Sequence, residues 1–186
     1  SRIPPEREET AAGGMNGLFA SGFGTPEAPY VLKTANHVLN MRKALVAGQM
    51  TYFSLEADVN LANHDWIPLN PVDPYANYIT FEGNNHVISN LTCMNQSYAS
   101  FFGVLYGECR NVGFVNASIS APAGSGAGVI GGYLGLANTP VHNCVFENCY
   151  TTGSVNGREA GGLVGTVGKT DGGKYCKIVN CYSTAH

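Results

Sequence analysis

The densest group of polar side chains in the chain follows a stretch of alternating apolar residues. It consists of Asp58, Asn60, His64, Asp65 and Asp73. Carboxylate and amide oxygens are the ligands that Ca²⁺ prefers, so Asp58, Asn60 and Asp65 are candidate calcium ligands. The same residue types fill turns between strands, where their side chains hydrogen-bond to nearby backbone groups. We favour this structural interpretation and predict neither a bound metal nor a cofactor.

Six cysteines are the chain's candidate nucleophiles or disulfide partners. None forms C-x-x-C, and no histidine lies at zinc-finger spacing. Cys144 and Cys176 are separated by 32 residues, as are Cys149 and Cys181, and the repeat described below places each pair on neighbouring coils. A disulfide is geometrically allowed there. We favour free thiols, because Ala117 fills the equivalent position and cysteine often packs as a small hydrophobic residue.

Catalysis by a carbohydrate-active enzyme requires acids that converge on one face, often with a basic residue. The acids of residues 100–186 are Glu108, Glu147, Glu159 and Asp171, and they occupy no common repeat position. The five histidines show no H-E-x-x-H pattern. We therefore predict no catalytic residues and no enzymatic activity. Three or more acids, or acids with Lys or Arg, meeting in a groove would favour an enzyme instead.

Aromatic side chains are the remaining candidates for ligand contact. Most of them fit better as inward-facing residues of a stacked core. Tyr150 and Tyr182 are the candidate ligand-binding residues if their rings point outward, where an aromatic face can stack on a sugar.

Composition excludes several classes of protein. Of the 186 residues, 44% are hydrophobic but only 12% are charged, and the net charge is −3 with ten scattered basic residues. Because no basic patch exists, nucleic-acid binding is not expected, and no apolar run is long enough to span a membrane. The 24 glycines, with many asparagines, favour β-structure with tight turns.

The local pattern changes from helix to strand along the chain. Residues 1–22 are weakly patterned, and we interpret them as a linker or the tail of a preceding module. Thr34 can cap a helix over residues 35–47, where apolar residues recur at helical spacing and Gly48 follows. From residue 51 the apolar residues alternate, which predicts short strands.

The second half of the chain is repetitive. Asn116, Asn148 and Asn180 recur at steps of 32 residues. The same step relates the set Phe114, Phe146 and Ile178 and the pair Cys149 and Cys181. A Gly-bounded apolar motif precedes each copy at varying distance, so loops of different length join fixed strands.

Such repeats predict a right-handed parallel β-helix. One unit cannot bury its own apolar face, but coils stacked at strand spacing enclose a continuous core. We expect Phe114, Phe146 and Ile178 to form an inward ladder, Cys149 and Cys181 another, and the three asparagines a hydrogen-bonded column. The helix at 35–47 would cap the first coil. The β-helix domain would cover 23–186, and we expect further coils beyond His186, where the pattern stops in mid-repeat.

Several segments resemble the GLUG-motif repeat of bacterial surface proteins. They are Gly162-Leu163-Val164-Gly165, Ile178-Val179-Asn180-Cys181-Tyr182, and upstream the stretches Gly24–Tyr30, Tyr52–Asp58, Trp66–Leu69 and Phe81–Leu91. The resemblance implies export, a right-handed parallel β-helix and an adhesin-like role of the kind found in Bacteroides-type bacteria. It carries over no catalytic residue.

We therefore expect a non-catalytic, secreted or cell-surface β-helix module of a larger chain that binds a glycan or a host protein. A carbohydrate-active β-helix enzyme, such as a polysaccharide lyase or glycoside hydrolase, and a structural spacer are the alternatives. Neither nucleic acid nor membrane insertion is expected for this segment.

Overall fold

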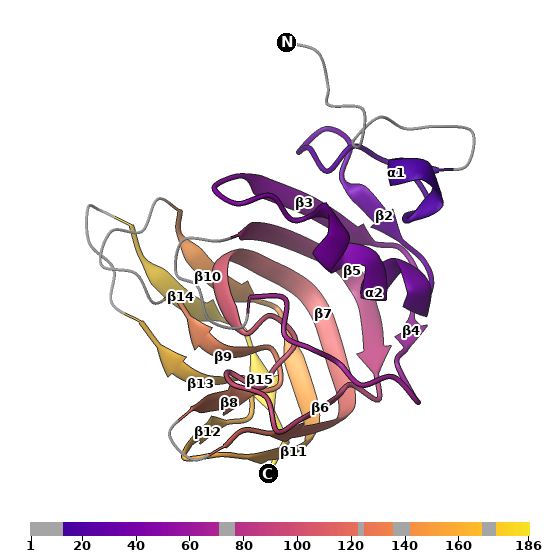
Figure 1. Ribbon diagram of the computed structural model, residues 1–186. Helices are drawn as coiled ribbons and strands as arrows, with labels where there is room; N and C mark the ends of the chain where they lie inside the picture. The colour runs from indigo at the N-terminus through magenta and orange to yellow at the C-terminus, as the bar shows by residue number, and fades with distance from the viewer. Residues whose placement is uncertain (1–12, 71–76, 123–124, 136–141, 169–173) are drawn as a thin grey trace.

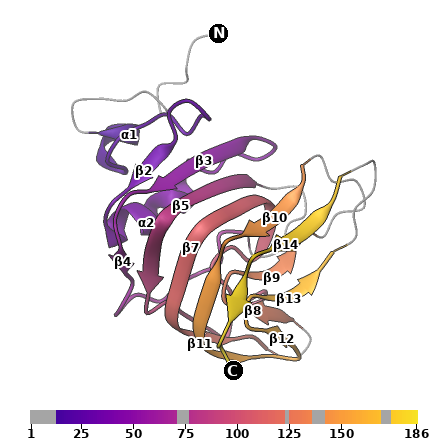
Figure 2. The same cartoon turned by 180° about the vertical axis from the view of Figure 1, so that it is seen from behind.

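The computed structural model describes residues 13–70, 77–122, 125–135, 142–168 and 174–186. Its long sheet stacks β2 (Tyr30–Leu32), β3 (Met50–Leu55), β5 (Tyr78–Ser89) and β7 (Val104–Ser120) as parallel neighbours. Figures 1 and 2 show these strands side by side, each one further along the chain than the last. This sheet of successive parallel strands is a β-solenoid and confirms the predicted β-helix.

The later coils continue the stack beyond β7. Strand β7 pairs with both β10 (Cys144–Glu147) and β11 (Tyr150–Asn156), which in turn pair with β14 (Cys176–Val179) and β15 (Tyr182–Ser183). Two further faces contain β9 (Gly131–Leu134) with β13 (Val164–Val167), and β8 (Gly126–Gly128) with β12 (Glu159–Gly161). Short strands β4 (Val59–Asn60) and β6 (Thr92–Met94) extend the faces of β5 and β7.

An inward ladder runs through the whole stack. Its members are successive register partners, in the order Tyr30, Phe53, Phe81, Cys109, Phe146 and Ile178. The first five are buried, whereas Ile178 in the last coil is 39% exposed. Apolar side chains at equivalent positions therefore cover one another from coil to coil, which stabilises the fold because no coil could bury them alone.

The predicted ladder of Phe114, Phe146 and Ile178 is only partly correct. Phe146 and Ile178 are register partners, but Phe114 lies between Ile88 and Thr151 on the next face. Cys149 and Cys181 lie on neighbouring coils as predicted, since the Cys149 N–H points to the Cys181 Sγ at 3.4 Å.

The asparagines form two columns rather than the predicted one. Asn116 donates to Asn90, which donates to Asn60, along one corner of the coil. Asn148 instead donates to Asn111, 37 residues earlier, at another corner. The 32-residue repeat was misleading because β7 passes through two corners, each of which needs a residue with positive φ.

The N-terminal segment belongs to the core more than predicted. Helix α2 (Ala35–Ala44) connects β2 to β3, with Thr34 accepting a hydrogen bond from the His37 N–H as its cap. It ends earlier than expected because Leu45 is extended. Its buried face packs in the hydrophobic core of the first coil. The predicted linker over 1–22 falls partly on residues 1–12, outside the described part, and Phe19 of that segment is buried against Tyr30.

Candidate functional site

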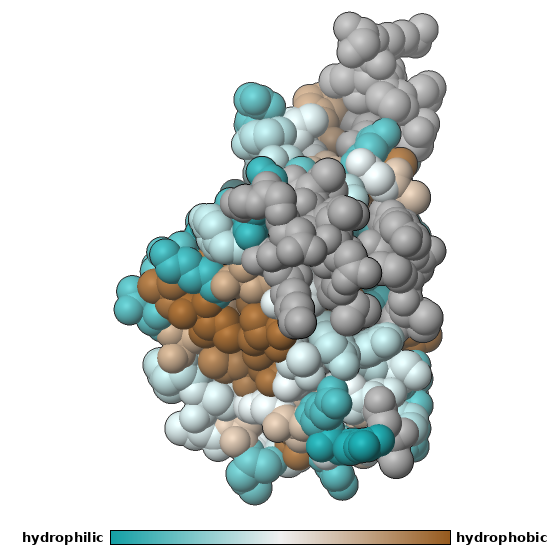
Figure 3. All heavy atoms as spheres, turned by 90° about the vertical axis from the view of Figure 1, so that its left-hand side faces the viewer, coloured by the Kyte–Doolittle hydropathy of each residue, from teal (hydrophilic) through white to brown (hydrophobic). Residues whose placement is uncertain are grey.

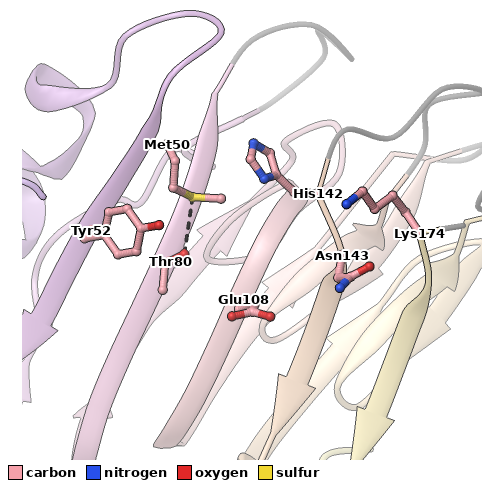
Figure 4. A pocket seen from close by; sticks show the side chains of 7 residues that line it. All are labelled: Met50, Tyr52, Thr80, Glu108, His142, Asn143 and Lys174. Atoms are coloured by element: carbon pink, nitrogen blue, oxygen red, sulfur yellow. Dashed lines mark hydrogen bonds between the residues drawn. The ribbon is translucent and has the colours of Figure 1, made fainter. Parts of the chain in front are cut away.

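A polar pocket opens on the outer face of the long sheet, near the starts of the strands. Its volume is about 220 Å³, and it is lined by Met50, Tyr52, Thr80, Glu108, His142, Asn143 and Lys174. Figure 4 shows these side chains arranged across β3, β5, β7 and the segments that lead into β10 and β14. Five successive passes of the chain therefore contribute to one site.

The sheet register positions the floor of the pocket. Tyr52, Thr80 and Glu108 are successive register partners on β3, β5 and β7. Their side chains alternate with the buried ladder residues, so they point outward. Thr80 Oγ1 donates to the Met50 sulfur at 3.2 Å.

An ion-pair network borders the pocket beside Glu108. The Arg110 guanidinium donates from Nη1 to Glu108 and from Nε to Glu147, the latter at 2.7 Å. The hydrogen bond that Arg110 donates to Glu108 is the main reason why the Arg110 pKa is raised, so the guanidinium remains charged. Glu108 thus has its orientation fixed from one side and presents its carboxylate to the pocket.

The wall opposite carries an imidazole and an amine. The His142 ring meets the Tyr78 ring edge to face, with centroids 4.6 Å apart. Burial is the main cause that lowers the His142 pKa, and the positive charge of Lys174 lowers it further. The negative charge of Glu108 acts in the opposite direction. His142 is therefore mainly neutral at pH 7 and offers both a donor and an acceptor.

Asn143 and Lys174 complete the site from neighbouring coils. Asn143 Oδ1 accepts the Tyr175 N–H at 3.2 Å, which ties the two segments together. This contact leaves the Asn143 amide nitrogen for other partners. A carboxylate, an imidazole, an amine, an amide and a phenol meet here. Such a set can hydrogen-bond a ligand rich in hydroxyl, amide or carboxylate groups.

The candidate calcium ligands have partners within the protein. Asp58 Oδ1 accepts the Val87 N–H at 3.0 Å and lies 3.1 Å from His86 Nδ1. Both contacts lower the Asp58 pKa, and the hydrogen bond from the Val87 N–H has the larger effect. Asn60 Oδ1 accepts from the Ala62 N–H and from Asn90. Asp65 forms an isolated backbone β-bridge with Thr92, which does not involve its carboxylate. Asp73 lies outside the described residues. These contacts of Asp58 and Asn60 support the interpretation that their side chains stabilise turns.

Tyr150 and Tyr182 form an outward stack. They are register partners whose rings are 5.3 Å apart and nearly parallel, and Tyr182 is 60% exposed. The Tyr150 ring also covers Gly113, where a Cβ atom would approach the ring to 2.2 Å. One ring face of each tyrosine is therefore occupied by the other, and the outer face of Tyr182 is the one left for a planar or sugar ligand.

Sequence reasoning named none of the pocket residues as site residues. Glu108 was considered and set aside because it shares no repeat position with the other acids. The pocket forms because coils of different length bring non-equivalent residues together at the strand starts. The one available signal was the recurrence of polar residues just before or early in each strand.

No family model matches the sequence, and no curated protein does. Among solved structures, the chain is similar to a crystal structure from Bacteroides ovatus named "putative immunoglobulin A1 protease". The TM-score is 0.86 and the sequence identity 45%, and the match covers 91% of this chain and 51% of that one. The chain thus spans about half the length of its solved neighbour.

The comparison corrects the prediction that this protein is not an enzyme. The solved neighbour is named a protease, and that name points to an enzyme. The correction rests on that name, because the pocket holds one acid with a lysine and the sequence argument had asked for three or more acids, or several acids with Lys or Arg. In the described part of the chain, no helix is long and apolar enough to cross a membrane.

Proposed function

We propose that this chain is the β-helix module of a larger exported, cell-surface enzyme of the protease type. In this proposal the module binds the glycan or protein that the enzyme acts on. The polar pocket on the outer face of the sheet carries the proposal, because it gathers Glu108, His142 and Lys174 from three separate passes of the chain. The likeness to a Bacteroides ovatus protein whose name refers to an immunoglobulin A1 protease supports the enzymatic context and a host protein as the ligand.

The lining of the pocket suits a polar group of a ligand rather than an apolar side chain. Its floor is made of hydroxyl groups and a carboxylate, and its rim supplies an amine and a neutral imidazole. A sugar hydroxyl can accept from Lys174 while it donates to Glu108, and a peptide amide can do the same. The adhesin-like role implied by the GLUG resemblance is retained here as ligand binding by the module.

A binding screen on the intact protein tests this proposal. The protein is applied to a glycan array and to immobilised host proteins, with immunoglobulin A1 among them. We expect a ligand whose affinity falls at least tenfold in the Lys174→Ala and Glu108→Gln variants, since a lost charge-assisted hydrogen bond costs about 1.5–3 kcal/mol.

The control for this screen is Lys177→Ala. Lys177 is an exposed lysine on β14 that does not line the pocket. It should leave binding unchanged. If no ligand is found, the module is a structural spacer and the proposal fails. If the three variants bind alike, the pocket is not the binding site.

The convergence of Glu108, His142 and Lys174 also favours a second candidate, a carbohydrate-active site in the pocket itself. A carboxylate with a neutral imidazole or an amine is the residue set that acid–base cleavage of a glycan uses. Incubation of the intact protein with any glycan found by the array separates the two candidates. Cleavage would be established if new reducing ends or unsaturated sugars form with the unmodified protein and not with the Glu108→Gln variant. A glycan that remains unchanged would show that the pocket binds it without cleaving it.

A further inference from the structure

Four of the six cysteines bracket the last pair of strands on the main face. Cys144 and Cys176 are the first residues of β10 and β14, and they are register partners. Cys149 and Cys181 follow the same strands, each directly after an asparagine with positive φ. The two pairs therefore occupy equivalent places at the two ends of one strand pair.

The sulfur atoms of the first pair converge. A Cβ atom at Gly135 would lie 2.8 Å from the Cys176 Sγ and 3.2 Å from the Cys144 Sγ, so both sulfurs point toward one spot. Adjacent parallel strands are about 4.8 Å apart, which falls inside the range of Cα separations, about 4.4–6.8 Å, that a disulfide tolerates.

The second pair has the same relation. The Cys181 sulfur accepts the Cys149 N–H at 3.4 Å, which places the two residues in direct contact. Cys149 also contacts Cys109, since its thiol donates to the Cys109 carbonyl at 3.4 Å. The nearest competing partner for Cys149 is therefore Cys109.

Access to solvent differs within each pair. Cys144 and Cys149 are buried, whereas Cys176 and Cys181 are partly exposed. A small oxidant can therefore react first with the partly exposed thiol of each pair. The buried thiol of the same pair lies beside the cysteine that has reacted. Burial, followed by the neighbouring Cys144, raises the pKa of the Cys176 thiol to about 12, so the reaction in the folded protein is slow at neutral pH.

The four thiols are free in the structure, as the sequence favoured. We propose that Cys144–Cys176 and Cys149–Cys181 are nevertheless two sites where an oxidant can form disulfides, which would fasten the last coil to the one before it. The oxidant is a small disulfide such as oxidised glutathione. The thiolate of Cys176 attacks one glutathione sulfur, and the other glutathione leaves as a thiolate that takes up the proton lost from Cys176. The thiolate of Cys144 then attacks the Cys176 sulfur and releases the second glutathione in the same way. Cys181 and Cys149 react in the same order.

Within these 186 residues, the coil held in this way has fewer strand partners than the coil before it. In the described part of the chain, β14 and β15 have a strand partner on one side alone. Ile178 and Val167 are 39% and 46% exposed. Figure 3 shows a hydrophobic patch on the side of the molecule where β13 and β14 lie. A covalent link across a loop of about 30 residues removes freedom from the unfolded coil, which stabilises the folded one.

Equilibration of the folded protein with oxidised glutathione tests the inference. Of the six thiols we expect two to remain, Cys93 and Cys109, and peptide mapping should find the two proposed linkages. The oxidation rate should rise about tenfold per pH unit between pH 7 and 9, because the thiolate fraction does so below a pKa of about 12. The midpoint of thermal unfolding should rise by about 5–10 °C.

Matched variants keep the test independent of folding. Cys176→Ser should retain only the 149–181 bridge, Cys181→Ser only the 144–176 bridge, and Cys93→Ser both. Six free thiols after equilibration at pH 9, or a Cys109–Cys149 linkage in place of Cys149–Cys181, would overturn the inference. Ligand binding by the pocket does not enter this readout, so its outcome is separate from that of the proposed function.

Discussion

At the scale of single residues, the corners of the coil show what sequence reasoning could and could not reach. Asparagine was correctly recognised as a corner residue, because it tolerates positive φ and hydrogen-bonds to its own kind. The partners were assigned wrongly, since Asn148 belongs to the column of Asn111 and not to that of Asn116. Sequence spacing cannot distinguish two corners that both carry asparagine when loops of different length separate them.

His142 gives a prediction for pH dependence. Burial lowers its pKa in the folded state, so the unfolded chain binds more protons once the pH falls below the ordinary histidine value of about 6.5. The folded state therefore loses stability as the pH falls, and gains nothing further well above that value. His37 shifts in the same direction. We expect the urea midpoint to drop between pH 7.5 and 5.

His142→Gln is the variant that checks this cause. It should reduce the drop without abolishing it, because His37 still contributes. His64→Gln serves as the control and should leave the drop as it is in the unmodified protein. A pH dependence unaffected by His142→Gln would show that His142 has no part in it.

At the scale of elements, strand alternation was the most reliable signal. Alternating apolar residues predicted the strand after residue 51, and the structure has β3 at Met50–Leu55. The helix was also predicted, with its cap at Thr34, but its end was placed too late. The pocket could not be predicted, because its walls come from the residues before β10 and β14, whose alignment with Glu108 depends on loop lengths rather than on the repeat.

The inward ladder predicts that truncation of a single buried side chain in β5 strongly lowers the free energy of unfolding. Phe81 is buried between Phe53 and Cys109 and also meets the Phe101 ring. Phe81→Ala should lower the free energy of unfolding by about 3–5 kcal/mol, because it leaves a cavity in a closed stack. Urea denaturation measures this loss. Lys177→Ala, at an exposed position, should change the free energy by less than about 0.5 kcal/mol.

At the scale of the whole molecule, stability should decrease from the middle of the stack toward its last coil. Strands β5 and β7 have partners on both sides, whereas in the described part of the chain β14 and β15 have one. Hydrogen exchange under native conditions, with the thiols kept reduced, should therefore be slowest in β5 and β7 and fastest in β14 and β15. Uniform protection across all coils would contradict this expectation.

The repeat thus made the architecture predictable, whereas the proposal of an enzymatic context rests on the name of a solved protein of which this chain covers about half. A solenoid repeats its structural residues and varies its functional ones, so periodicity reports on the core and is silent about the pocket. This is why Phe146, Ile178 and Cys181 could be placed from the sequence, although Lys174 and His142 could not.

The most direct test of the account is to follow the histidine ring signals by NMR during titration with a ligand from the binding screen. Among the five histidines, His142 lines the pocket. We predict that the His142 signals move in proportion to occupancy while those of His64 stay in place. Saturation of the protein with ligand while His142 remains unchanged would contradict the assignment of the pocket as the binding site.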